Sequence, residues 1–167
     1  DDPEGLFHVS QKIMKSTPNA HILDQYGNAD NPDAHEEGTA KEIWNDFAGE
    51  IDMIVVGVGT GGTITGIAKY FKKKNPNIKI IGADPYGSVL GGGDEVYPYK
   101  VEGIGYDFFP DVLDNTLVDE YVKVGDKDSF KIARKLIKNE GLLCGGSSGT
   151  VVWAALQKAQ KLSKGQK

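Results

Sequence analysis

The sequence has little of several features, and each shortage excludes a class of protein. Its only cysteine is Cys144, which excludes an internal disulfide and any metal site built from several cysteines. No apolar run approaches the roughly 20 residues that a membrane-spanning helix needs, and the acidic start does not resemble a signal peptide. The 19 basic residues are outnumbered by 24 acidic ones, so the charge pattern of a nucleic-acid-binding protein is lacking. We therefore expect a cytoplasmic protein without membrane or nucleic-acid partners.

Metal-binding patterns are also lacking. The three histidines, His8, His21 and His35, show no spacing that forms a metal site, and we assign them no chemistry. The 167 residues, of which 39% are hydrophobic and 26% charged, suffice for a globular domain with a real core.

The hydrophobic pattern predicts strands that alternate with helices. Near-continuous apolar runs at 53–56 and 78–83 are typical of strands in a parallel sheet covered on both faces, and 118–124 alternates like a strand. In the helix expected at 63–74, apolar residues recur with helical spacing: Ile64, Ile67, Ala68 and Phe71. The fold class is thus α/β, a largely parallel twisted sheet with helices on both faces.

The other segments are assigned from local signals. We expect helices at 4–15, at 39–47, from 126 onward and at 148–162, a short strand at 20–23, and loops at 26–37 and 86–110. Asp126 and Ser148 are the expected helix caps, and Gly141 is the expected helix end.

The most informative motif follows the first apolar run. It reads Gly57-Val58-Gly59-Thr60-Gly61-Gly62-Thr63 and opens the helix expected at 63–74. Such a turn points several backbone N–H groups at one spot, where the helix dipole adds positive charge. The motif therefore predicts a phosphate site formed by five residues: Gly59, Thr60, Gly61, Gly62 and Thr63.

This motif alone is compatible with a nicotinamide cofactor. The glycine spacing fits G-x-G-x-x-G, and Asp84 follows about 20 residues later, where a carboxylate would hold a ribose. Asp84 also precedes Pro85 at the expected end of a strand, so its alternative role is to cap or fix a loop.

A second glycine-rich turn points to a different cofactor. Residues 145–149 follow Leu142-Leu143-Cys144 and also open a helix, which places the neutral hydroxyl of Ser147 at a helix start. Pyridoxal phosphate needs both a phosphate site and a partner for its ring nitrogen, and a neutral partner suits elimination at the β-carbon. The alternative is that 145–149 is only a capped turn, with Cys144 as a small buried residue at a strand end.

The chain resembles the cystathionine β-synthases, which belong to the fold-type II pyridoxal-phosphate enzymes. The matching stretches are His21 to Tyr26, Gly57 to Gly66, Ile80 to Pro85, Val101 to Phe108 and Glu140 to Gly149. The resemblance implies that pyridoxal 5′-phosphate is bound by the phosphate site together with Ser147 and the backbone at Gly103. It also implies a pocket for the substrates, formed by Gln25, Tyr26, Glu102 and Tyr106. Both tyrosines have the alternative role of ordinary loop anchors.

The activity implied by the resemblance is a β-replacement that condenses serine with homocysteine to give cystathionine, in a homodimer. Three alternatives remain open. The chain could be an O-acetylserine sulfhydrylase, a nicotinamide-dependent dehydrogenase, or a non-catalytic module with this fold.

The resemblance also implies what this sequence lacks. In the family, a lysine on an N-terminal segment anchors the cofactor covalently and moves the proton, and no stretch here matches that segment. We expect residues 1–25 to be the tail of the small domain and the crossover, and residues 26–167 to be most of the large cofactor-binding domain. The chain is therefore expected to be a fragment or an engineered piece, with no catalytic residue of its own and no turnover when isolated.

Overall fold

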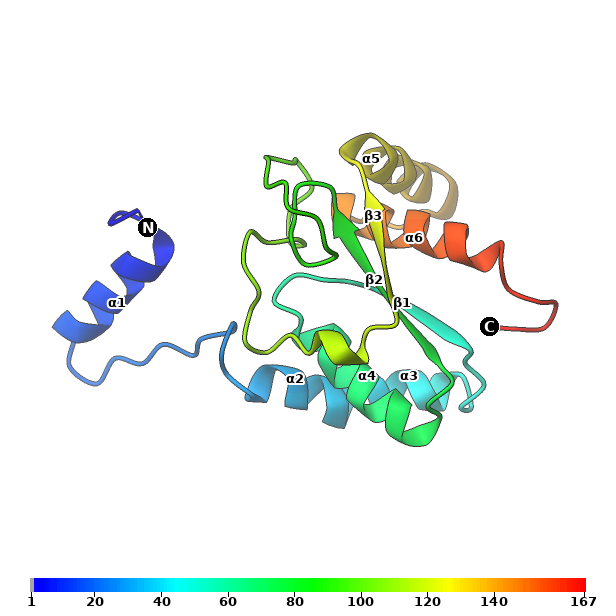
Figure 1. The fold of residues 1–167 in the computed structure, drawn as a ribbon, viewed down its shortest axis with the longest axis horizontal. Coiled ribbons are helices and arrows are strands. Elements are labelled where there is room, and N and C mark those ends of the chain that lie inside the picture. Colours follow the sequence, from blue (N-terminus) through cyan, green and yellow to red (C-terminus); the bar gives the residue numbers. More distant parts are fainter. Residues whose placement is uncertain (1) are drawn as a thin grey trace.

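A three-stranded parallel sheet organises the chain. The computed structural model describes residues 2–167, in which β1 (Met53–Gly57), β2 (Lys79–Pro85) and β3 (Glu120–Val124) lie in the order β1-β2-β3. Val55 pairs with Ile81 across β1 and β2, and Ala83 pairs with Val122 across β2 and β3. The predicted α/β class with a parallel sheet is confirmed (Figure 1).

Helices cover both faces of this sheet. Figure 1 shows α2 (Asp30–Ala34), α3 (Ala40–Asp46) and α4 (Gly62–Lys74) on one side, and α5 (Asp126–Lys135) and α6 (Gly146–Ala159) on the other. Two π-helical turns extend this set: η1 (His35–Thr39) joins α2 to α3, and η3 (Leu136–Glu140) follows α5. A short 3-10 turn, η2 (Asn115–Leu117), precedes β3.

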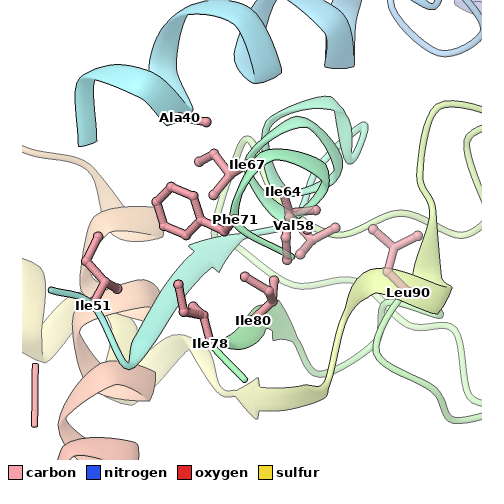
Figure 2. Packing of buried hydrophobic residues seen from close by; sticks show 10 residues of the cluster. Ala40, Ile51, Val58, Ile64, Ile67, Phe71, Ile78, Ile80 and Leu90 are labelled. Atoms are coloured by element: carbon pink, nitrogen blue, oxygen red, sulfur yellow. The ribbon is translucent and has the colours of Figure 1, made fainter. Parts of the chain in front are cut away.

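The larger core lies between α4 and the sheet. All four apolar residues whose spacing predicted this helix are buried, and Phe71 is fully enclosed. Figure 2 shows Ile64, Ile67 and Phe71 with Ile78, Ile80 and Val58 below and Ala40 above. Strand alternation divides the side chains, because Ile54 and Val56 face this core whereas Val55 packs on the opposite face with Ala83, Val124 and Ala154.

A partly exposed ion pair between Lys72 and Asp119 fixes the end of the sheet that lies away from the glycine-rich loop. Asp119 accepts hydrogen bonds from the backbone N–H of Ile80 at 2.8 Å and from Lys72 Nζ at 2.7 Å. Burial alone would raise the pKa of Asp119, but the Ile80 N–H and the Lys72 ammonium outweigh it and hold the pKa below its ordinary value. The carboxylate therefore ties α4 to β2 and β3 in its ionised form.

We expect Asp119→Asn to lower the free energy of unfolding by about 1–2 kcal/mol at pH 7. Because the folded-state pKa is depressed, this contribution is present above the ordinary carboxyl pKa and is lost as the pH falls through the folded value. The difference between variant and wild type should thus shrink below about pH 4, which urea unfolding at several pH values measures. Asp94→Asn, at an exposed loop position, is the control, and a constant difference from pH 7 to pH 3 would contradict the assignment.

Helix α1 (Leu6–Ser16) has no buried residue and stands apart from the sheet in Figure 1. Its contact with the rest of the chain includes Phe7, whose ring lies 5.2 Å from that of Tyr26 and 6.0 Å from that of Phe108. Leu6 and Ile13 are 71% and 57% exposed, so the apolar stripe of this helix is uncovered within residues 2–167. The proposed boundary after residue 25 stays a prediction.

Two predicted segments differ from the structure. Residues 20–23 form no strand, because no other described segment pairs with them and a strand needs a partner for its backbone groups. Residues 26–37 are not all loop, since α2 and the start of η1 occupy their second half. Pro32 stands in the first turn of α2, where its missing N–H costs nothing.

The predicted caps are also wrong. Gly125 and Gly145, not Asp126 and Ser148, are the cap residues of α5 and α6, and neither cap has a side-chain hydrogen bond. The Asp126 carboxylate instead accepts from the backbone N–H groups of Lys100 and Val101, at 2.9 and 3.1 Å. It therefore fixes the loop before the glycines at 103 and 105.

Two further expectations concern the turn before α6. Cys144 is only half-buried and follows no strand, because residues 142–144 have no ladder partner among residues 2–167 and Leu143 is 89% exposed. Gly141 ends η3, as predicted, with a φ of 69°.

Over residues 2–167, helices long and apolar enough for a membrane span are absent, as are groups of three or more potential metal ligands.

Candidate active site

The glycine-rich loop connects the carboxyl end of β1 to the start of α4. Gly61 caps the helix with a φ of 89°, a left-handed conformation that favours glycine. The first backbone N–H groups of α4 have no carbonyl to bind within the helix and point out of its end. The local sequence thus produces the arrangement that binds anions at helix N-termini.

A cavity of about 370 Å³ opens over this loop. Its volume suits a small phosphorylated ligand. No carboxylate is among its lining residues, which favours an anion. These residues are Gln25, Gly57, Gly59, Thr60, Gly61, Thr63, Ile64, Gly103 and Tyr106.

The opposite wall of the cavity is the segment from Gly103 to Tyr106. Gly105 N–H donates to the Val58 carbonyl at 2.7 Å, which holds this segment against the loop. A Cβ atom at Gly59 would lie only 2.8 Å from the Gly103 carbonyl oxygen, so glycine is needed at 59 for this approach. Gly103 itself has a φ of 84°. Two segments far apart in sequence therefore share one cavity because both contain glycine where they meet.

Two tyrosines meet at the rim. The hydroxyl groups of Tyr26 and Tyr106 lie 3.1 Å apart, and their rings are in edge contact at 5.5 Å. Burial, followed by the hydrogen bond with Tyr26, raises the pKa of Tyr106 to about 12. Tyr106 therefore stays a neutral phenol at neutral pH and can offer a hydrogen bond to a polar ligand. Because Phe7 and Phe108 complete this aromatic cluster, the alternative role of loop anchor also applies to both tyrosines.

The structure brings most, but not all, of the predicted site residues to the cavity. Gly62 lies beside it as the first residue of α4, and Tyr26 reaches it through Tyr106. Glu102 is exposed, next to Gly103. The roles of all the predicted site residues in binding stay predictions.

Ser147 is not among the residues that line this cavity. It lies in the first turn of α6, on the face of the sheet opposite α4. Both helices nevertheless begin at the carboxyl edge of the sheet, and a Cβ at Gly57 would lie 3.1 Å from Val151, one turn along α6 from Ser147. The two helix starts therefore approach the same strand end, and contact of Ser147 with a cofactor ring stays a prediction.

Asp84 does not have the position that nicotinamide binding requires. Its side chain is fully buried, and its Oδ2 accepts from Gly91 N–H at 2.8 Å and from Lys123 Nζ at 2.7 Å. The carboxylate fixes the loop after β2, as the alternative interpretation predicted. A ribose could not reach it.

Two residues beside the loop were missed. Asn31 Nδ2 donates to Thr60 Oγ1 at 3.2 Å, and His35 Nε2 lies 3.1 Å from Thr63 Oγ1. Spacing gives no signal for either contact, because about 30 residues separate the partners. The segment predicted as loop in fact folds against α4.

The family of the chain is shown by comparison with known proteins. A family model described as pyridoxal-phosphate dependent enzyme matches residues 1–167. The chain belongs to this family. Its cofactor, pyridoxal phosphate, is the one that the two glycine-rich turns and the resemblance predicted.

The relatives agree with this assignment. The chain is 53% identical to the cystathionine beta-synthase of Dictyostelium discoideum and 52% identical to that of Rattus norvegicus, in both cases over 100% of its length. It covers 34% and 31% of those proteins, so it spans about a third of the curated relatives it matches. The predicted resemblance is confirmed.

A solved structure shows the same fold. The O-acetylserine dependent cystathionine beta-synthase from Helicobacter pylori superposes with a TM-score of 0.92 at 39% identity. The match covers 97% of this chain and 53% of that one.

The residues around the cavity fit the family's cofactor. The wall at Gly59 and Gly61 leaves room that a Cβ would fill, the α4 start supplies N–H donors, and Thr60 and Thr63 add hydroxyl groups. The backbone N–H groups and the two hydroxyl groups can all donate hydrogen bonds to a phosphate ester.

Proposed function

We propose that this chain forms the phosphate-binding part of a pyridoxal-phosphate enzyme that condenses serine with homocysteine to cystathionine. The observation that carries the proposal is the cavity in which the start of α4 faces Gly103 and Tyr106. Similarity over the full length of the chain to cystathionine beta-synthases supports the choice of reaction. We further propose a cytosolic homodimer for the whole protein.

In this proposal the chain's own residues bind and orient. The backbone N–H groups at the start of α4, with Thr60 and Thr63, hold the phosphate, and Ser147 offers a neutral hydroxyl to the ring nitrogen. The neutral phenol of Tyr106 and the side chain of Gln25 border the space for the incoming thiol. When bound, the cofactor supplies an electron sink for the amino acid's α-carbon.

O-acetylserine is an alternative to serine as the first substrate. The Helicobacter pylori protein that shares this fold is described as O-acetylserine dependent. Acetate leaves more readily than hydroxide, so the same site could replace either group. Supplying serine or O-acetylserine with homocysteine or sulfide to the complete enzyme separates the synthase from a sulfhydrylase.

The chain alone is expected to bind pyridoxal phosphate weakly and without turnover. Fluorescence titration should give tighter binding of pyridoxal phosphate than of pyridoxal, with inorganic phosphate as a competitor, because the phosphate contacts dominate. Equal affinity for pyridoxal and pyridoxal phosphate would contradict the phosphate site. Sustained cystathionine formation by the chain alone would show that it contains a proton-transferring lysine after all.

A further inference from the structure

The two threonines of the glycine-rich loop, Thr60 and Thr63, each contact a side chain from the α2–η1 segment. Asn31 Nδ2 donates to the backbone carbonyl oxygen of Gln25 at 2.7 Å and to Thr60 Oγ1 at 3.2 Å. The His35 ring lies between two hydroxyl groups, with Nε2 3.1 Å from Thr63 Oγ1 and Nδ1 2.9 Å from Thr39 Oγ1. Both side chains are partly buried.

The direction of the Asn31–Thr60 hydrogen bond follows from chemistry. The Gln25 carbonyl can only accept, so the Asn31 atom that faces it is the amide nitrogen. That nitrogen can only donate, and Thr60 Oγ1 must therefore accept. The hydroxyl proton of Thr60 is left to donate to another group, and Thr60 lines the cavity.

The same logic applies to His35 in one of its tautomers. With the proton on Nε2, the ring donates to Thr63 Oγ1, while Nδ1 accepts from the Thr39 hydroxyl. Each group then donates once in the same direction, and the Thr63 proton is free to point into the cavity. With the proton on Nδ1, Thr63 would have to donate to the ring and would turn its proton away from the cavity.

We propose that Asn31 and His35 are positioning residues, which aim the Thr60 and Thr63 hydroxyl protons at a bound phosphate group. The proposal rests on the phosphate site proposed above and names the residues that orient it. With both protons directed into the cavity, the threonines join the backbone N–H groups as donors. The dianion of a phosphate ester, which can only accept, is the ligand that matches such a set.

The packing explains how the two side chains hold their places. A Cβ at Gly62 would lie 1.9 Å from Asn31 Oδ1, and one at Gly66 would lie 2.2 Å from the Pro32 carbonyl oxygen. These glycines let the α2–η1 segment lie directly against α4. Ion pairs between Lys69 and Asp33, at 3.7 Å, and between Lys73 and Glu36 join the same two elements.

Asn31→Asp tests the first contact without changing side-chain size. A carboxylate cannot donate to Thr60, so the hydroxyl proton of Thr60 is drawn away from the cavity and a negative charge is added beside it. We expect the affinity for inorganic phosphate at pH 8, measured by ³¹P NMR titration, to fall at least tenfold. Asn28→Asp is the control, because it adds the same charge, and Asn28 bonds to the Leu23 carbonyl and the Asp30 N–H rather than to either threonine.

Two amide variants test His35. A glutamine amide can place its NH₂ near the position of Nε2, whereas an asparagine amide reaches only to about Nδ1. His35→Gln should keep phosphate affinity within about threefold of wild type, and His35→Asn should lose about tenfold. A purely structural role would not separate the two variants in this order. Nitrogen-15 NMR of the wild-type ring with phosphate bound should show the proton on Nε2.

The outcomes separate this inference from the proposed function. If wild type fails to bind both inorganic phosphate and pyridoxal phosphate, the phosphate site and the inference fall together. If wild type binds but Asn31→Asp and His35→Asn bind as well as it does, only the positioning role is overturned. An Nδ1-protonated ring in the phosphate complex would overturn the role of His35 even if a variant failed to fold.

Discussion

Gly149→Ala is expected to lower the free energy of unfolding by about 3 kcal/mol. A Cβ at this position would lie 1.9 Å from the Ser129 carbonyl oxygen and 2.8 Å from the Ala133 nitrogen. Both are backbone atoms of α5, which cannot rotate away as a side chain would. Helices α5 and α6 must therefore separate, and the buried hydrogen bond of 2.7 Å from Thr150 Oγ1 to Ser129 Oγ would be stretched.

Urea unfolding followed by circular dichroism measures this effect, and Gly38→Ala is the matched control. Gly38 also lies in a helical turn, but a Cβ there meets no atom within 4 Å. Alanine at 38 should stabilise the chain by about 0.5–1 kcal/mol, because it restricts the unfolded chain and suits a helix. A change below about 0.5 kcal/mol for Gly149→Ala would show that the two helices are not held at this separation.

The elements that could be predicted are those with a local cause. Helix α4 repeats apolar residues with helical spacing, and β1 and β2 are short apolar runs, so their own sequences suffice. The strand expected at 20–23 was wrong because a strand depends on a partner that its own sequence does not specify. Nothing in the pattern of residues 30–39 showed that α4 offers glycines at 62 and 66 for a helical segment to pack against.

In the candidate site, too, the residues that could be predicted are those with a local signal in the sequence. The glycine-rich loop between β1 and α4 could be predicted because a strand, glycines and a helix start follow one another in sequence. Its opposite wall at Gly103 and Tyr106 came from a family resemblance, since nothing local joins residue 59 to residue 103. Asn31 and His35 could not be predicted, because their roles depend on hydrogen bonds to Thr60 and Thr63 that form only in the folded chain.

Gly61→Ala should lower the affinity of the chain for inorganic phosphate and for pyridoxal phosphate about 100-fold. Gly61 has a φ of 89°, which costs other residues roughly 1–2 kcal/mol. A Cβ there would also lie 2.6 Å from the Cβ of Leu113 and 3.0 Å from its Cα. Relief of the strain and the clash must rotate the peptide groups on either side, which turns the N–H donors at the start of α4 away from the anion. Isothermal titration calorimetry with each ligand measures the loss.

Gly141→Ala separates this effect from backbone strain alone. Gly141 has a similar φ of 69°, but a Cβ there meets no atom within 4 Å, and the residue lies at the end of η3. Gly141→Ala should cost only the stability lost to a positive φ and leave phosphate affinity unchanged. Gly61→Asn provides a second measurement if the alanine variant does not fold, since asparagine tolerates a positive φ but keeps the Cβ that meets Leu113. Wild-type affinity in both variants at 61 would mean that the phosphate is not held by this loop.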